Sequence, residues 1–151
     1  MHTLAMKVSK KGMYMSSGVD QFNKLVGIIF AKSFECFPTP VEIQSSDMLE
    51  IFIDSNDFGG SFNFDQKFRD TVQWLERYDY VWIKRDMCSM GNSSYALTLT
   101  ERSFEILRQT PASLEGETLG DKLVSFSKDK ASEAFGALIP LIITSALAIS
   151  N

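Results

Sequence analysis

Few side chains in this sequence have the types and spacing that catalysis requires. The only histidine among the 151 residues is His2, so serine or cysteine nucleophiles lack a histidine base and a polyhistidine metal site lacks ligands. Ser125 and Lys128 have the spacing that places a base one helical turn from a nucleophile, but no partner motif accompanies them. Residues 57–59 repeat the Asp-Phe-Gly letters of the kinase magnesium motif without its glycine-rich loop, which favours a turn. We therefore expect no catalytic residues, no metal site, no cofactor and no enzymatic activity.

The two cysteines, Cys36 and Cys88, have neither a CxxC motif nor metal-ligand spacing. Isolated cysteines of this kind are typical of reduced thiols in the cytoplasm. The first residues contain no apolar stretch of the length that a secretory signal needs. We therefore predict a cytoplasmic protein.

The charge of the chain bears on nucleic-acid binding. Its 19 acidic and 15 basic side chains give a net charge of -4, which argues against strong non-specific binding to phosphates. The charge is uneven, because residues 1–35 hold five lysines against two acids and residues 36–75 hold seven acids against two cations. Any basic patch must therefore be assembled locally from a few side chains.

Hydrophobic spacing divides the first half of the chain into a tail and helices. Residues 1–17 have no hydrophobic period, which predicts a flexible tail. Apolar residues then recur at spacings of three and four, which predicts an amphipathic helix from residue 19 to about residue 36, before two prolines. We expect a short strand at residues 41–43, a second helix capped within residues 45–47, and a third helix over residues 65–78.

The second half of the chain begins with two β-like runs. They cover residues 80–84 and 95–99, and the segment between them, residues 87–93, is expected to be a loop too long for a two-residue hairpin turn. Thr100 is expected to cap a fourth helix that stops before Pro111, and another helix follows residues 115–117. Residues 134–151 contain no charged side chain.

This order of elements resembles the winged helix-turn-helix superfamily. Three local matches support the resemblance: the Phe-Pro-Thr-Pro run at residues 37–40, the Trp74-Leu75 pair near the end of the third helix, and the Leu97-Thr98 pair that leads into the fourth. The resemblance covers about residues 18–112, and this segment is similar to bacterial winged-helix proteins. It implies an α+β, mostly α fold: a winged helix-turn-helix domain over residues 18–112 with a C-terminal helical extension over residues 113–151.

The resemblance also implies a mode of DNA binding. The third helix would enter the major groove, and the wing would touch phosphate or the minor groove. Glutamine can pair with adenine and arginine with guanine, although the wing tip itself has no Lys or Arg. The residues assigned to DNA contact in this way are Lys67, Asp70, Gln73, Arg77, Lys84 and Arg85. The alternative is an ordinary solvated helix face with Lys67 and Asp70 as an ion pair, and Trp74 and Trp82 are expected in the core.

The apolar C-terminal segment must be covered by something. A membrane-spanning helix needs about 20 apolar residues, whereas residues 134–149 supply 16 with a proline inside. Burial in a dimer or partner interface is therefore preferred over a lipid surface. The residues expected in that interface are Leu119, Leu123, Phe126, Phe135, Leu138 and Ile142.

These patterns lead to three functional hypotheses. The first is a dimeric DNA-binding transcriptional regulator in the cytoplasm. The second is a protein-interaction adaptor on a winged-helix scaffold, suggested by the acidic balance, the uncharged wing tip and the apolar tail. The third is a membrane-associated protein that uses the apolar tail as its attachment.

Overall fold

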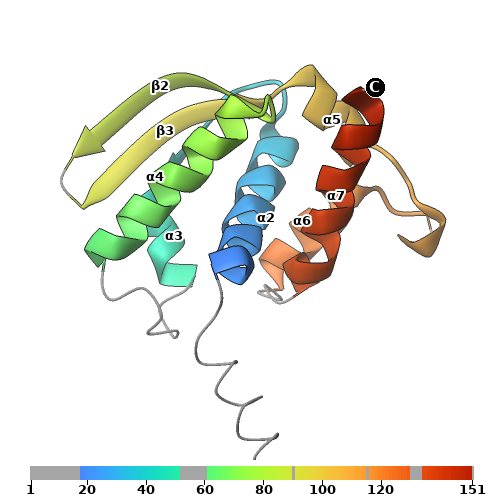
Figure 1. Ribbon diagram of the computed structural model, residues 1–151, viewed down its shortest axis with the longest axis horizontal. Coiled ribbons are helices and arrows are strands. Elements are labelled where there is room, and N and C mark those ends of the chain that lie inside the picture. The colour runs from blue at the N-terminus through green and yellow to red at the C-terminus, as the bar shows by residue number, and fades with distance from the viewer. Residues whose placement is uncertain (1–17, 52–60, 90, 115, 130–133, 151) are drawn as a thin grey trace, which may run out of the picture.

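A small antiparallel sheet is covered on one face by helices (Figure 1). The computed structural model describes residues 18–51, 61–89, 91–114, 116–129 and 134–150. Within them the chain is mostly helical with one three-stranded sheet, so the expected α+β, mostly α class is confirmed. The expected tail at residues 1–17 lies outside the described residues. Residues 52–60, between the second and third helices, also lie outside them.

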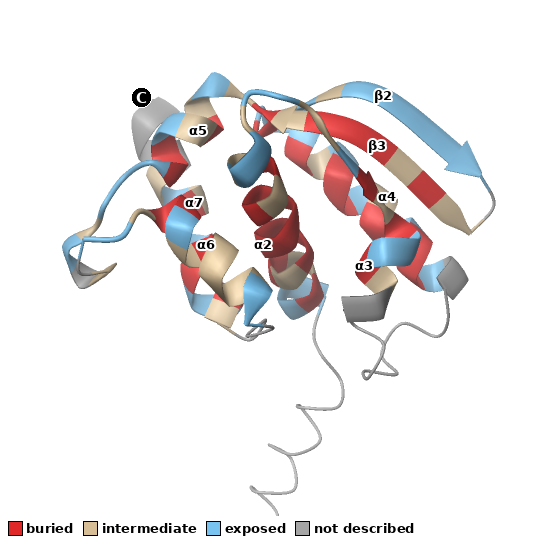
Figure 2. Ribbon diagram, turned by 180° about the vertical axis from the view of Figure 1, so that it is seen from behind, coloured by how far each residue is buried: buried red, intermediate tan, exposed pale blue. Residues whose placement is uncertain are grey.

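Helix α2, Gly18–Cys36, is the centre of the fold. Its middle turns are buried on nearly every side (Figure 2), and Val26, Ile29 and Phe30 have no exposed surface. Figure 1 shows α2 between α4 on one side and α6 and α7 on the other. The helix ends at Cys36, just before Phe37 and Pro38, as the proline rule predicts.

The three strands are β1 (Val41–Gln44), β2 (Val81–Ser89) and β3 (Asn92–Leu99), arranged in the order β1-β3-β2. Strand β1 confirms the expected strand. The expected loop over residues 87–93 is wrong, because β2 continues to Ser89 and β3 begins at Asn92. Gly91, with a positive φ of 81°, lies in the tight connection. Backbone hydrogen bonding extends both strands to residues 87–89 and 92–94. The sequence there does not alternate between apolar and polar residues, so it gave no signal for a strand.

Helix α3 (Ser45–Ile51) follows β1 directly, and α4 (Ser61–Arg77) follows it in the chain. Helix α4 begins four residues earlier than the apolar pattern predicts. Its expected buried stripe is confirmed, because Phe64, Phe68, Val72 and Leu75 are all at most 1% exposed.

The fourth predicted helix is α5, Glu101–Leu107, and its cap is confirmed. The hydroxyl oxygen of Thr100 accepts a hydrogen bond from the backbone N–H of Ser103 and donates one to the carbonyl of Asp79. A short 3-10 turn, η2 (Ala112–Leu114), leads to α6 (Leu119–Lys128) and α7 (Phe135–Ser150), which contains Pro140.

The C-terminal helices complete the core of their own chain, which corrects the prediction of a partner interface. Five of the six residues expected at that interface are at most 6% exposed within a single chain, and Phe126 is half-buried: Leu119, Leu123, Phe126, Phe135, Leu138 and Ile142. Residues 25–31 of α2 are all apolar or glycine and all buried, so α4 and the sheet cover only part of this stretch. The apolar C-terminal segment covers the remainder.

Two glycines allow this close packing. A Cβ atom on Gly27 would lie 2.5 Å from Cγ of Phe135, and one on Gly120 would lie 2.6 Å from the ring of Phe34. Both distances are shorter than real Cβ contacts. The absence of a side chain at these positions therefore lets α6 and α7 approach α2 closely.

Candidate functional site

The outer face of α4 carries the four helix residues assigned to DNA contact. Lys67, Asp70, Gln73 and Arg77 are all exposed, and at 100° per residue they fall within one third of the helix circumference. Lys67 lies at the edge nearest α2, where it lines a pocket. Gln73 lies at the opposite edge, next to Tyr95 of β3. The structure therefore brings these four side chains together on one face.

The two cations of β2 are both exposed, but a β-bulge separates them. Ile83 pairs with Leu97 and Arg85 pairs with Ala96, so Lys84 is the extra residue of the bulge. Residues directly opposite each other share one face of an antiparallel sheet. Arg85 therefore shares the face of Ala96, which is the face turned away from the helices.

The same register places two large apolar side chains on that open face. Trp82 lies opposite Thr98 and Met87 lies opposite Ser94, and Trp82 and Met87 are 53% and 73% exposed. The expectation that Trp82 belongs to the core is wrong. Trp74 is half-buried and stacks on Tyr80 with ring centroids 5.6 Å apart.

A buried carboxylate joins α4 to two neighbouring strands of the sheet. Asp65 is 3% exposed, and its Oδ1 accepts hydrogen bonds from the hydroxyl of Ser45 at 2.7 Å and the backbone N–H of Ser93 at 2.8 Å. Its Oδ2 accepts a hydrogen bond from the Ser93 hydroxyl at 3.2 Å and lies 3.3 Å from Nε of Arg69. The Arg69 contact is an ion pair without hydrogen-bond alignment. Asp65 thus ties the end of β1, the start of β3 and α4 together.

Two tyrosines are buried beside charged or polar groups. Burial raises the pKa of the Tyr95 phenol, and the Cys88 thiol 3.9 Å away adds to this effect, whereas Gln73 and Arg69 oppose it. Burial also raises the pKa of Tyr80, although the guanidinium of Arg102, 5.1 Å from the ring centroid, acts in the opposite direction. Both phenols therefore stay protonated beyond the ordinary tyrosine range.

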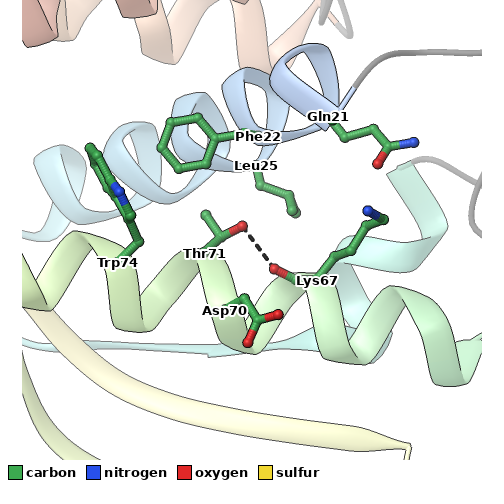
Figure 3. Close-up of a pocket in the computed structure, with 8 residues that line it drawn as sticks. Gln21, Phe22, Leu25, Lys67, Asp70, Thr71 and Trp74 are labelled. Carbon is green, nitrogen blue, oxygen red and sulfur yellow. Dashed lines mark hydrogen bonds between the residues drawn. The ribbon is translucent and has the colours of Figure 1, made fainter.

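A pocket of about 390 Å³ lies between the first turns of α2 and the middle of α4. This volume falls in the range typical of small-molecule sites, about 300–1,000 Å³. Its apolar surface is formed by Phe22, Leu25 and Trp74 (Figure 3). The rings of Phe22 and Trp74 meet edge to face with centroids 4.9 Å apart, so the aromatic surface is held in one geometry.

Four polar side chains surround this apolar surface: Gln21, Lys67, Asp70 and Thr71. Oε1 of Gln21 has no hydrogen-bond partner in the described part of the chain, although the residue is 6% exposed. In Figure 3 the Gln21 amide and the Lys67 ammonium lie at the same end of the pocket. No described carboxylate forms an ion pair with Lys67, so the alternative of a Lys67–Asp70 pair is not supported. Asp70 instead accepts a hydrogen bond from Nε2 of Gln66 at 3.0 Å.

Gln21 and Asp65 were not singled out from the sequence, although a signal exists for each. Gln21 precedes Leu25 and Ile28 by four and seven residues, which puts it in phase with the buried face of α2. Asp65 precedes Phe68 and Val72 by three and seven residues, so it lies in phase with the buried face of α4. A polar residue on a buried face has either a structural partner or a binding role.

No group of three or more His, Cys, Asp and Glu side chains among the described residues is placed to hold a metal ion. Cys36 and Cys88 are free and exposed. No helix in the described ranges has the length and hydropathy needed to cross a membrane.

Comparison with known proteins leaves the function to be inferred from the chain's own residues. No protein-family model matches the chain, and neither the characterised proteins nor the solved structures contain a significant match.

Proposed function

We propose that this chain is a winged-helix protein that binds duplex DNA through α4. The observation that supports the proposal is the exposed face of α4, with Lys67, Gln73 and Arg77, beside a long β2–β3 hairpin (Figure 1). The order helix, strand, helix, helix, strand, strand and the sheet order β1-β3-β2 are compatible with a winged helix. In that arrangement α4 occupies the major groove and the hairpin is the wing.

The charges near α4 set the expected character of the interaction. Residues 61–89 contain five basic and five acidic side chains, so the field attracting DNA is weak. Binding is therefore expected to be detectable at low salt and to depend on a small number of direct contacts. Lys67, Arg77 and Lys84 can reach phosphates or guanine, and Gln73 can pair with adenine. Arg85, on the open face of the sheet, is not included in this surface.

The test is fluorescence anisotropy of the full chain with a random-sequence duplex library and with sequences selected from it. Three phosphate contacts predict a slope of about −3 in a plot of log affinity against log salt. The double variant Lys67→Ala, Arg77→Ala should reduce that slope by about 2. The matched control Arg108→Ala, Lys128→Ala removes the same charge from the C-terminal ends of α5 and α6 and should leave binding unchanged. The absence of binding at low salt, or equal losses in both variants, would contradict the proposal.

A two-fold dimer is part of this proposal, with a surface different from the one expected from the sequence. The outer side of α7 is exposed and uncharged, and consists of Gly136, Ala137, Pro140, Leu141 and Thr144. Two copies joined there would present two α4 helices to a palindromic site. Light scattering after gel filtration should give twice the chain mass, and Leu141→Lys should give the monomer. A monomeric native chain would remove the dimer from the proposal and leave single-site binding.

A protein-interaction module is the second candidate. The specific observation is the open face of the sheet, where Trp82 and Met87 are exposed on β2. Strand β2 is also an edge of the sheet as far as the described residues show, and a free edge can accept a strand from another protein. A photo-crosslinker at position 87 should then capture one stoichiometric protein, and Trp82→Ala should abolish the capture. A crosslinker at the exposed Glu101 of α5 is the control, and equal capture from both positions would contradict this candidate.

A further inference from the structure

The α2–α4 pocket combines an apolar wall with a cation, and the DNA-binding proposal uses only the cation. Phe22, Leu25 and Trp74 form the apolar surface. In Figure 3 the Lys67 side chain extends from α4 towards α2 at the end of the pocket opposite Trp74. None of the described carboxylates forms an ion pair with Lys67. We propose that this pocket binds an amphipathic monocarboxylate, a molecule with one carboxylate group on an apolar body.

The polar groups around the pocket determine the sign of the ligand's charge. Asp70 lines the pocket, but in Figure 3 its carboxylate points away from α2, and it accepts a hydrogen bond from Nε2 of Gln66 at 3.0 Å. The Thr71 hydroxyl donates to the backbone carbonyl of Lys67 at 2.8 Å, and Oε1 of Gln21 is buried. The Lys67 ammonium is therefore the charged group that faces the pocket, and it is complementary to an anion.

A single negative charge matches this end of the pocket. A carboxylate carries one charge, which the Lys67 ammonium balances, whereas a phosphate monoester carries nearly two at neutral pH. Asp70 lies three residues from Lys67 on α4, and its negative charge opposes a second negative charge on the ligand. The charge balance therefore favours a carboxylate over a phosphate.

The rest of the pocket recognises an apolar body of limited length. Phe22 and Trp74 meet edge to face with ring centroids 4.9 Å apart, and Trp74 stacks on Tyr80, so the aromatic wall is in place before a ligand arrives. Lys67 and Trp74 are seven residues apart on α4, which is about 10 Å along the helix axis. Extended octanoate, or a phenyl ring on a short linker, spans this distance with its carboxylate at Lys67.

Fluorescence titration of the full chain tests this assignment, because Trp74 lies in the pocket. The chain has two tryptophans, and Trp82 is exposed on the open face of the sheet, so Trp82→Phe leaves Trp74 as the reporter. We expect octanoate or 3-phenylpropanoate, below its micelle-forming concentration, to bind and to change the emission of Trp74. Saturable binding in calorimetry without that change would place the ligand elsewhere and overturn the assignment. The absence of binding by both acids would also overturn it.

Matched ligands separate the charge from the apolar body. Octanamide and 3-phenylpropanamide lack the charge and octylammonium reverses it, so each should bind about tenfold or more weakly than the corresponding acid. Hexanoate lacks two methylenes and should bind about tenfold more weakly than octanoate. An amide or amine that binds as tightly as its acid would overturn the assignment. Octyl phosphate should bind no more tightly than octanoate, and tighter binding would overturn the choice of a carboxylate.

A variant of the cation tests its contact with the carboxylate. Lys67→Met removes the charge and keeps an unbranched side chain, so it should weaken the acid about tenfold and leave the amide unchanged. Lys84→Met makes the same change at an exposed position of β2 outside the pocket and should leave both ligands unchanged. Equal affinity of the acid for Lys67→Met and the native chain would overturn the proposal. These titrations contain no DNA, so their outcome is independent of whether α4 binds DNA.

Discussion

Replacing Asp65 by alanine should destabilise the protein strongly, although the residue resembles an ordinary acidic position at the start of a helix. The carboxylate is 3% exposed and accepts three hydrogen bonds, of 2.7, 2.8 and 3.2 Å. A hydrogen bond to a charged group contributes about 1.5–3 kcal/mol. Three of them would give an upper bound of several kcal/mol, which overestimates the loss because two of the donors have alternative acceptors.

The alternative acceptors lower the expected cost. The Ser45 hydroxyl is also 3.1 Å from Oδ1 of Asn92, and the Ser93 N–H is also 3.1 Å from Oγ of Ser45. Both donors therefore keep one partner in Asp65→Ala, and only the Ser93 hydroxyl loses its acceptor. We expect a loss of about 3 kcal/mol, made of weakened hydrogen bonds and the cavity left by the carboxylate. This lies within the total stability of about 5–15 kcal/mol, so the variant should fold.

The ion pair with Arg69 should contribute much less than the hydrogen bonds. The Arg69 side chain is 34% exposed, so water screens its ion pair with Asp65. Water can also solvate the guanidinium of Arg69 when Asp65 is replaced. Arg69→Ala is expected to cost at most about 1 kcal/mol. The comparison of the two variants therefore distinguishes hydrogen bonding to Ser45 and Ser93 from charge pairing.

Urea unfolding followed by circular dichroism measures these differences. With a slope of about 2 kcal/mol per molar urea, Asp65→Ala should lower the midpoint by about 1.5 M. The matched control is Asp70→Ala, an exposed acid on the same helix, which should change stability by no more than about 0.5 kcal/mol. A loss below about 1 kcal/mol in Asp65→Ala, or an equal loss in Arg69→Ala, would refute this account of the buried carboxylate.

Two further predictions concern packing and pH. Gly27→Ala should destabilise the protein by about 1–3 kcal/mol in urea unfolding, because the new methyl group would overlap the ring of Phe135. Gly136→Ala is the control: open space surrounds this position, so the change should be neutral or stabilising by up to about 1 kcal/mol. Equal effects of the two variants would contradict the docking of α7 on α2. Because burial raises the pKa of Tyr95 and Tyr80, the unfolded chain loses these phenolic protons first. The contribution of the two tyrosines to stability should therefore be constant below about pH 10 and fall above it. Tyr95→Phe should flatten that alkaline decline in thermal melts, and an unchanged decline would show that Tyr95 does not titrate as proposed.

The α4 surface shows how far sequence reasoning reaches for a site. Helical spacing correctly placed Lys67, Asp70, Gln73 and Arg77 on one exposed face, because that depends only on the helix repeat. The position of Arg85 could not be predicted in this way. The bulge at Lys84 sets the face on which every later β2 side chain lies, and no local residue pattern marks it.

By itself the sequence determined the end of α2, the buried stripe of α4 and the capped turn at Thr100. These features depend on hydrophobic spacing, prolines and capping hydroxyls, all of which act over a few residues. Only the tertiary structure decided what the apolar faces cover. The sequence showed that residues 134–149 must be buried, but it is Gly27 that allows them to pack on α2 of the same chain. Gln21 and Asp65 show the same difference between sequence and tertiary structure. Their spacing from the apolar residues of their helices predicts that they are buried. Whether a buried polar atom has a hydrogen-bond partner depends on segments far apart in the chain.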